Sequence, residues 1–215
     1  MLLQAKALSH HFDMPLYENI HLQVDSGQSI AILGVSGSGK STLLANLSTM
    51  LKPCSGCVEI LGQDIYALKE SQRLSLLRTK LGIIFQSHYL FRGFSARENL
   101  EVGTILARQS IDMQLLENFG IAHTLEQNSA DLSGGQQQRL SIARVLMKQP
   151  TIIFADEPTG NLDKATAHSV MDALLAYIAD KNGALIIATH DESIAKKCTK
   201  IYRIQKHGLD PLQLR

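Results

Sequence analysis

A glycine-rich run at residues 34–41 is the part of the sequence whose residue types point most directly to chemistry. It fits the pattern G-x-x-x-x-G-K-[ST] and is followed by Thr42. Its glycines let backbone N–H groups face a phosphate, and a helix starting there adds the attraction of its positive end. We expect Lys40 to reach the β- and γ-phosphates of a nucleoside triphosphate and the Ser41 hydroxyl to ligate Mg²⁺. The expected binding residues are Gly34, Ser36, Gly37, Ser38, Gly39, Lys40, Ser41 and Thr42.

Two adjacent carboxylates, Asp156 and Glu157, follow an apolar run at residues 152–155. Ligands of open α/β sheets lie beyond the carboxyl ends of the strands, so both side chains should face the nucleotide. Asp156 is suited to hold the Mg²⁺ shell, and Glu157 is suited to act as the general base on the attacking water. The alternative is a solvated acidic loop before Pro158, which the phosphate-binding run upstream makes the weaker interpretation.

A second glycine-rich segment, residues 132–136, precedes a helix that we expect from about residue 136. The N-terminus of a helix attracts anions. One nucleotide already has its phosphates wrapped by the first run, so a second cradle is useful only if it closes on the γ-phosphate from another subunit. An ordinary glycine turn before a helix is the alternative.

The order and spacing of these segments resemble the ABC ATPase family. Residues 132–136 match the family signature LSGGQ, and Gln137-Gln138-Arg139 match its usual continuation. The resemblance covers about residues 3–208. It implies ATP and Mg²⁺ as ligands and a head-to-tail homodimer. In that dimer Ser133, Gly134, Gly135 and Gln136 close on the ATP held by the phosphate loop of the other subunit.

Further positions match the family one by one. Gln86 resembles the glutamine that contacts Mg²⁺ and the water, and His190 resembles the switch histidine on the γ-phosphate. Asp163 resembles the D-loop aspartate, which touches the partner subunit. Phe12 stands where the family has an aromatic residue that stacks on adenine, with Tyr17 as a rival. The resemblance implies Lys40, Gln86, Glu157 and His190 as catalytic residues and Ser41, Gln86 and Asp156 as metal ligands.

Strand-like and helix-like segments alternate along much of the chain. They predict an α/β fold with a parallel sheet covered on both faces, in line with a P-loop NTPase with a RecA-like core sheet and an antiparallel β subdomain. We expect a hairpin at residues 24–30 and no clear pattern after Gly208. We also expect one ABC ATPase domain over residues 1–215. Residues 1–86 and 150–215 form its core with the β subdomain, and residues 87–149 form an inserted α-helical subdomain that carries the signature.

Composition limits the classes of protein. Hydrophobic residues make up 45% of the chain, charged residues 19%, and the formal net charge is +1. These values are ordinary for a globular protein and give no sign of a nucleic-acid-binding surface. We expect no membrane-spanning segment, no signal peptide and a peripheral place on the cytoplasmic face of the inner membrane. Cys54 and Cys57 lack a second pair at a zinc-site spacing, and their role is not indicated.

Residues 89–100 resemble the surface on which an ABC membrane subunit docks, with Tyr89, Leu90, Phe91 and Phe94 as apolar contacts. Ordinary packing of the helical subdomain is the alternative. Residues 159–163 match the branch that contains lipoprotein-release, macrolide-export and FtsE-like ATPases. We prefer the ATPase subunit of a lipoprotein-release transporter with separate permease subunits. Macrolide- or toxin-type export and an FtsE-like role stay open.

Functions of other classes fit less well. Chromosome-maintenance and DNA-repair members of the family insert long coiled coils between the phosphate loop and the signature, and no sustained heptads occur there. Translation-factor members carry two cassettes, and one phosphate loop is visible in this sequence. In a P-loop kinase outside the ABC family, the segment at residues 132–136 has no role.

Overall fold

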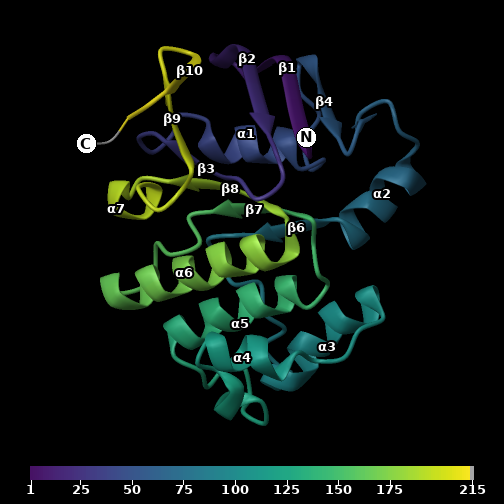
Figure 1. Ribbon diagram of the computed structural model, residues 1–215, viewed down its shortest axis with the longest axis vertical. Coiled ribbons are helices and arrows are strands. Elements are labelled where there is room, and N and C mark those ends of the chain that lie inside the picture. Colours follow the sequence, from purple (N-terminus) through teal and green to yellow (C-terminus); the bar gives the residue numbers. More distant parts are fainter. Residues whose placement is uncertain (214–215) are drawn as a thin grey trace.

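In residues 1–213, which the computed structural model describes apart from the side chains of residues 106 and 107, six strands form a central sheet (Figure 1). Their order is β10-β9-β3-β8-β7-β6, with β10 antiparallel at one edge and the other pairs parallel. The bounds are β3 Ser29–Leu33, β6 Leu81–Ile84, β7 Ile152–Asp156, β8 Ala184–Thr189, β9 Lys200–Gln205 and β10 Gly208–Pro211.

The register of the central strands decides which loops meet. Leu33 of β3 pairs with Thr189 of β8, and Asp156 of β7 pairs with Ala188 of β8. The carboxyl ends of β3, β7 and β8 therefore lie at one edge of the sheet. The predicted parallel sheet is confirmed, and the segments that follow these strands are brought side by side.

Strand β3 packs against a different apolar core on each face. Ala31 and Leu33 belong to the core beside helices α5 (Gly134–Leu146) and α6 (Lys164–Lys181). Ile30 and Ile32 belong to the core beside helix α1 (Lys40–Leu47). A continuous apolar run is therefore buried on both faces, and each isoleucine side chain contributes about 1.5–3 kcal/mol on burial.

A smaller antiparallel sheet covers the α1 side, with the strand order β2-β1-β4-β5. The predicted hairpin at residues 24–30 is wrong, because β2 pairs with β1 in this sheet and β3 belongs to the central sheet. The turn between β2 and β3 is held by the residue before β8, since Gly27 N donates to Gly183 O at 2.7 Å. The bounds are β1 Leu3–His11, β2 Pro15–Val24, β4 Ser55–Ile60 and β5 Gln63–Asp64.

Helices gather at the end of the molecule opposite the antiparallel sheet (Figure 1). They are α3 (Ala96–Ala107), α4 (Met113–Asn118) and α5, with a 3₁₀ helix at Ala122–Thr124 between α4 and α5. α3 begins at a capping box in which Ser95 N donates to Glu98 Oε2 at 2.7 Å. These helices lie within residues 87–149, and the division of the chain into a core and an inserted subdomain stays a prediction.

The remaining helices are α2 (Glu70–Thr79), which precedes β6, and the short α7 (Glu192–Ala195), which follows β8. The chain after Gly208 forms β10, although its sequence shows no clear pattern. None of the helices in the described part of the chain is both long enough and apolar enough to cross a membrane.

Candidate functional site

The loop at residues 34–39 connects β3 to α1 and leaves the start of that helix open. Gly39 is the N-cap residue and has a φ of 94°, a left-handed conformation that glycine adopts without steric cost. In the described residues no side chain caps α1, so its first N–H groups are available to an anion. A Cβ atom at Gly34 would lie 2.4 Å from Ser38 Oγ and 2.7 Å from Cγ2 of the buried Ile204, so a larger residue there would displace both side chains.

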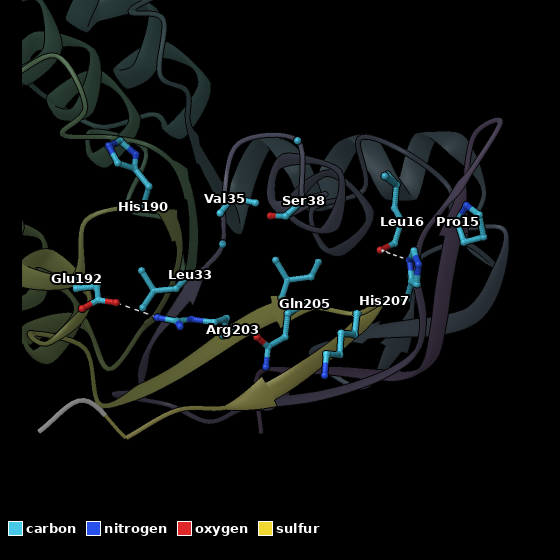
Figure 2. A pocket seen from close by; sticks show the side chains of 14 residues that line it. Pro15, Leu16, Leu33, Val35, Ser38, His190, Glu192, Arg203, Gln205 and His207 are labelled. Carbon is cyan, nitrogen blue, oxygen red and sulfur yellow. Dashed lines mark hydrogen bonds and ion pairs between the residues drawn. The ribbon is translucent and has the colours of Figure 1, made fainter.

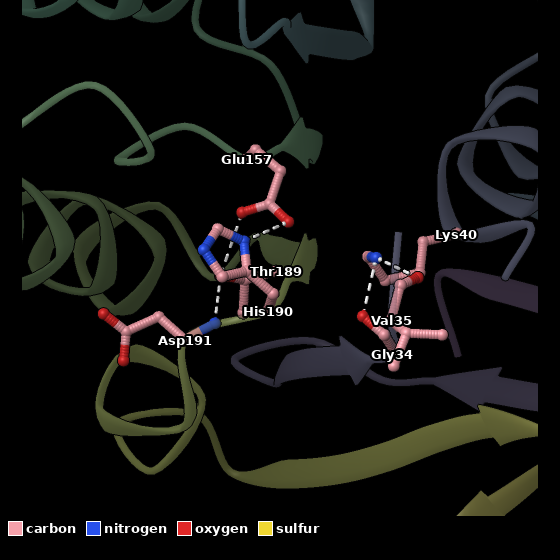
Figure 3. Close-up of polar contacts among 7 residues, drawn as sticks. All are labelled: Gly34, Val35, Lys40, Glu157, Thr189, His190 and Asp191. Carbon is pink, nitrogen blue, oxygen red and sulfur yellow. Dashed lines mark hydrogen bonds and ion pairs between the residues drawn. The ribbon is translucent and has the colours of Figure 1, made fainter. Parts of the chain in front are cut away.

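Lys40 is buried, at 7% exposure, directly under this loop. Its Nζ donates to Gly34 O at 2.8 Å and to Val35 O at 3.1 Å (Figure 3). An ammonium group has three protons, so one donor is left for a ligand above the loop. Two carbonyl groups thereby hold the buried charge in place, and the described residues form no ion pair with it.

A cavity of about 750 Å³ opens above Lys40, within the size range of small-molecule sites. It brings together residues predicted from five separate parts of the sequence. Gln86, which follows β6, lies at its edge, and the backbone carbonyl of Gln86 accepts a bond from Asn161 Nδ2 at 3.4 Å. The predicted residues that line the cavity are Phe12, Ser36, Gly37, Gly39, Lys40, Ser41, Thr42, Gln86, Asp156, Glu157 and His190.

A second cavity of about 670 Å³ lies against the phosphate loop, and Figure 2 shows its walls. Gly34 and Ser38 line this cavity and not the larger one, while Gly37 and His190 line both. An ion pair between Arg203 and Glu192, 2.8 Å apart, forms part of its wall. The predicted phosphate-binding residues are therefore divided between two adjoining spaces.

Asp156 ends β7 and points its carboxylate toward the start of α1. Its Oδ1 atom is buried and has no hydrogen-bond partner in the described residues. Burial raises the pKa of Asp156, and a hydrogen bond with Ser41 and the charge of Lys40 oppose that rise. An unpartnered carboxylate oxygen beside a hydroxyl group is an arrangement that a hard divalent cation can complete.

Glu157 lies between two residues from the end of β8 (Figure 3). Its Oε1 is 2.9 Å from His190 Nδ1, and its Oε2 accepts a hydrogen bond from Thr189 Oγ1 at 3.2 Å. The His190 side chain is 69% exposed, whereas that of Glu157 is 14% exposed. Thr189 is absent from the residues predicted above. The signal for it is its place in the register, one residue after the Asp156–Ala188 pair.

The two candidates for the adenine-stacking position differ in accessibility. Phe12 is 61% exposed and lines the cavity of about 750 Å³. Tyr17 is fully buried, and its hydroxyl donates to Asn46 Oδ1. Burial raises the pKa of Tyr17, so the phenol is neutral. Tyr17 cannot stack on a ligand from this position, and Phe12 stays a prediction.

The signature segment lines neither cavity. Ser133 is the N-cap of α5, which begins at Gly134, earlier than predicted. The Ser133 side chain accepts a bond from Gln136 N at 3.3 Å, and Ser133 N donates to Gln136 Oε1 at 2.9 Å. A Cβ atom at Gly134 would meet no described atom within 4 Å, and one at Gly135 would meet Leu162 Cδ2 at 3.6 Å. Within one chain, the two glycine-rich cradles are thus separate.

Helix α5 links the signature segment to other parts of the site. Gln138 Nε2 donates to Pro158 O at 2.8 Å, which ties the helix to the residue after Glu157. Ser141 Oγ donates to His88 O at 2.7 Å, near the end of β6. The Arg144 guanidinium lies 5.7 Å from the centre of the Phe91 ring.

Asp163 caps helix α6 in this structure. Its carboxylate accepts bonds from Thr166 N at 3.0 Å and Thr166 Oγ1 at 2.6 Å. These bonds lower the pKa of Asp163 and keep it charged. The segment that the sequence assigns to contact with a second subunit therefore has a defined shape in the single chain.

Three exposed aromatic residues, Tyr89, Phe91 and Phe94, follow β6 and are together called the aromatic patch. Tyr89 is 67% exposed, Phe91 47% and Phe94 44%. The rings of Phe91 and Phe94 stack with their centroids 5.4 Å apart. Leu90 is only partly buried, against the core of α5 and α6. Three large apolar groups thus stay uncovered, which packing of the helical part alone does not explain.

Comparisons of this chain with known proteins agree on one family. A family model described as ABC transporter matches residues 17–160. The lipoprotein-releasing system ATP-binding protein LolD of Legionella pneumophila is 39% identical over 89% of this chain and 87% of its own length. The LolD proteins of Protochlamydia amoebophila and Xanthomonas campestris are 38% and 36% identical, with similar coverage.

Solved structures agree with these relatives. The dimeric, post-hydrolysis ATP-binding cassette MJ0796, bound to ADP and phosphate, matches with a TM-score of 0.89 at 28% identity. The match covers 100% of this chain and 99% of MJ0796. CbiO1 of Clostridium perfringens, part of an ABC transporter complex, matches with a TM-score of 0.85 at 28% identity over 97% of this chain and 86% of CbiO1.

Replacing Lys40 with methionine keeps the length of the side chain and removes its charge. Charge-assisted hydrogen bonds to a phosphate contribute about 1.5–3 kcal/mol. We expect ATP affinity to fall roughly 10- to 100-fold, measured by titration with a fluorescent ATP analogue. Lys52→Met, at an exposed lysine outside the cavity, is the matched control. Equal affinities of the two variants would contradict a phosphate-binding role for Lys40.

Proposed function

This chain belongs to the ABC transporter family, and we propose that it is the ATP-hydrolysing subunit of a transporter that releases lipoproteins from a membrane. The proposal of lipoprotein release is supported by relatives named for that activity, which match over about nine-tenths of this chain. The ATPase mechanism is supported by one geometric observation: the signature segment lies outside the cavity lined by Lys40, Ser41, Gln86, Asp156, Glu157 and His190.

That observation favours a site made by two copies of the chain. Ser133 caps the N-terminus of α5. Its hydroxyl accepts a bond from Gln136 N, so its own hydrogen is left for a ligand. Such a helix start attracts the γ-phosphate but has none within its own subunit. A head-to-tail homodimer brings it to the phosphate loop of the other copy. MJ0796, which shares the fold, is described as a dimer.

Three residues near the end of β7 carry oxygen atoms that fit Mg²⁺. Oδ1 of Asp156 has no hydrogen-bond partner in the described part of the chain. Together with the Ser41 hydroxyl and the Gln86 side-chain oxygen, it provides the oxygen ligands that this ion prefers. When bound, Mg²⁺ supplies positive charge that offsets the negative charge on the β- and γ-phosphates. We therefore assign Ser41, Gln86 and Asp156 to the metal and Phe12 and residues 34–42 to the nucleotide.

Three side chains of the protein have separate roles in ATP hydrolysis. Lys40 binds the β- and γ-phosphates with the donor that the loop carbonyls leave free. His190 is exposed enough to turn from Glu157 toward the γ-phosphate. Glu157 then accepts a proton from the attacking water as general base. Closure of the second subunit over the site excludes bulk water, which strengthens each of these interactions.

The aromatic patch of Tyr89, Phe91 and Phe94 fits an apolar segment of a permease. Arg144 connects Phe91 to helix α5, and Ser141 ties the neighbouring His88 to the same helix, which begins at the signature segment. Residues 87–149 then act as a helical subdomain that moves against residues 1–86 and 150–215. Docking of this kind holds the chain peripherally at the cytoplasmic face of the membrane.

Replacing Glu157 with glutamine removes the base but keeps the size of the side chain. We expect ATP hydrolysis to slow at least about 100-fold and a dimer to accumulate in saturating ATP-Mg²⁺, because closure is no longer followed by cleavage. Light scattering after size exclusion measures the dimer. A monomer under these conditions would contradict the composite site.

Replacing Ser133 with arginine places a bulky cation at the helix start that should meet the partner's ATP. We expect ATP binding to one chain to change less than about 3-fold, while ATP-driven dimerisation and hydrolysis are lost. Ser110→Arg, on an exposed loop, serves as the control. Loss of nucleotide binding in the Ser133 variant would instead place this segment in the same subunit's site.

Replacing Phe91 with aspartate puts a charge in the centre of the aromatic patch. We expect the recovery of integral-membrane subunits with the tagged chain to fall at least about tenfold, because desolvating the charge costs more than the contact provides. Newly made lipoproteins should then accumulate in the inner-membrane fraction. Met113→Asp, on α4, is the control. Normal lipoprotein release with Phe91→Asp would contradict this docking surface, and accumulation of another exported substrate would contradict the lipoprotein assignment.

A further inference from the structure

Glu157 is held by two partners that differ in mobility (Figure 3). His190, at Oε1, has an exposed side chain. Thr189, at Oε2, is only 1% exposed. It pairs with Leu33 of β3 in the middle of the central sheet. When His190 turns toward a ligand, Thr189 cannot follow it.

The direction of the Thr189 hydroxyl bond is fixed by a third residue. Asp191 N donates to Thr189 Oγ1 at 3.1 Å. A hydroxyl oxygen that already accepts this bond still has one hydrogen to donate. Glu157 is an acceptor when ionised, so the hydrogen points to Oε2. The backbone N–H, the hydroxyl and the carboxylate thus form a chain of hydrogen bonds, each donating to the next, and such chains strengthen one another.

The backbone conformation of Glu157 indicates that its contact with Thr189 is functional. Its φ is 45°, in the left-handed region that non-glycine residues rarely adopt. Glu157 N donates to Ala188 O at 2.9 Å, so the residue is held against the end of β8 next to Thr189. A strained backbone conformation persists when the surroundings fix it, and such residues gather at functional sites. Both the main chain and one carboxylate oxygen are therefore anchored to β8.

We propose that Thr189 is a positioning residue that holds Glu157 by Oε2 and leaves Oε1 free for the attacking water once His190 has moved. The proposal rests on the general-base role of Glu157 given above. In the step concerned, the water oxygen bonds to the γ-phosphorus and one water proton passes to Oε1. The bond from that phosphorus to the bridging oxygen breaks, and its electron pair stays on ADP. Misplacement of the carboxylate would slow this step without weakening ATP binding.

Three variants of Thr189 separate positioning from packing. Thr189→Val keeps the shape and loses the hydroxyl, whereas Thr189→Ser keeps the hydroxyl and loses a methyl group. We expect valine to lower kcat about tenfold with KM within about twofold, and serine to keep most of kcat. A packing role predicts the reverse order, with serine below valine. If the valine variant does not fold, Thr189→Ala takes its place and must fall below serine.

The same variants in a Glu157→Gln background complete the test, with steady-state ATP hydrolysis as the measurement. If Thr189 acts through the carboxylate, Thr189→Val should lower the residual rate by less than about twofold there. An equal tenfold loss in both backgrounds overturns the proposal, as does unchanged kcat in Thr189→Val alone. If Glu157→Gln itself does not slow hydrolysis, the general-base role fails instead, and the two failures are distinguishable.

Discussion

The parallel register of β3, β7 and β8 is the constraint on which the site depends. It places Leu33 beside Thr189 and Asp156 beside Ala188, so the phosphate loop, the acidic pair and His190 all begin at one edge. The register is itself fixed by burial, because Ile30 and Ile32 face one core and their neighbours face another. A shift by one residue would exchange the two faces of a strand and separate the proposed catalytic groups.

Two charges at this edge are incompletely satisfied in the chain alone. Among the described residues, buried Lys40 donates hydrogen bonds to two carbonyl groups, and Asp156 has a buried oxygen without a hydrogen-bond partner. A phosphate group and a divalent cation would complete both. Ligand binding should therefore stabilise the folded chain as well as start the cycle, since any ligand that binds the folded state alone raises its stability.

Local signals predicted the phosphate loop, because its glycine pattern, the preceding strand and the following helix are contiguous. Asp156, Glu157 and His190 were also identifiable, since they end apolar runs that become parallel strands. The pairing between distant segments could not be identified from the sequence. The turn after Val24 looks like a hairpin, yet β2 and β3 belong to different sheets. The sequence leaves Tyr17 as a rival to Phe12, and the difference in burial separates them. Thr189 becomes visible only once the register is known.

Helix α5 joins places that the sequence treats as separate motifs. Ser133 stands at its start, Gln138 contacts the loop after Glu157, and Arg144 lies near Phe91. Its 13 residues span about 20 Å. If the helix tilts as a rigid body by roughly 10°, one end is displaced by about 3 Å relative to the other. A displacement of that size at the Ser133 end equals the length of a hydrogen bond. At the Arg144 end, the same displacement reaches the partner that contacts the aromatic patch.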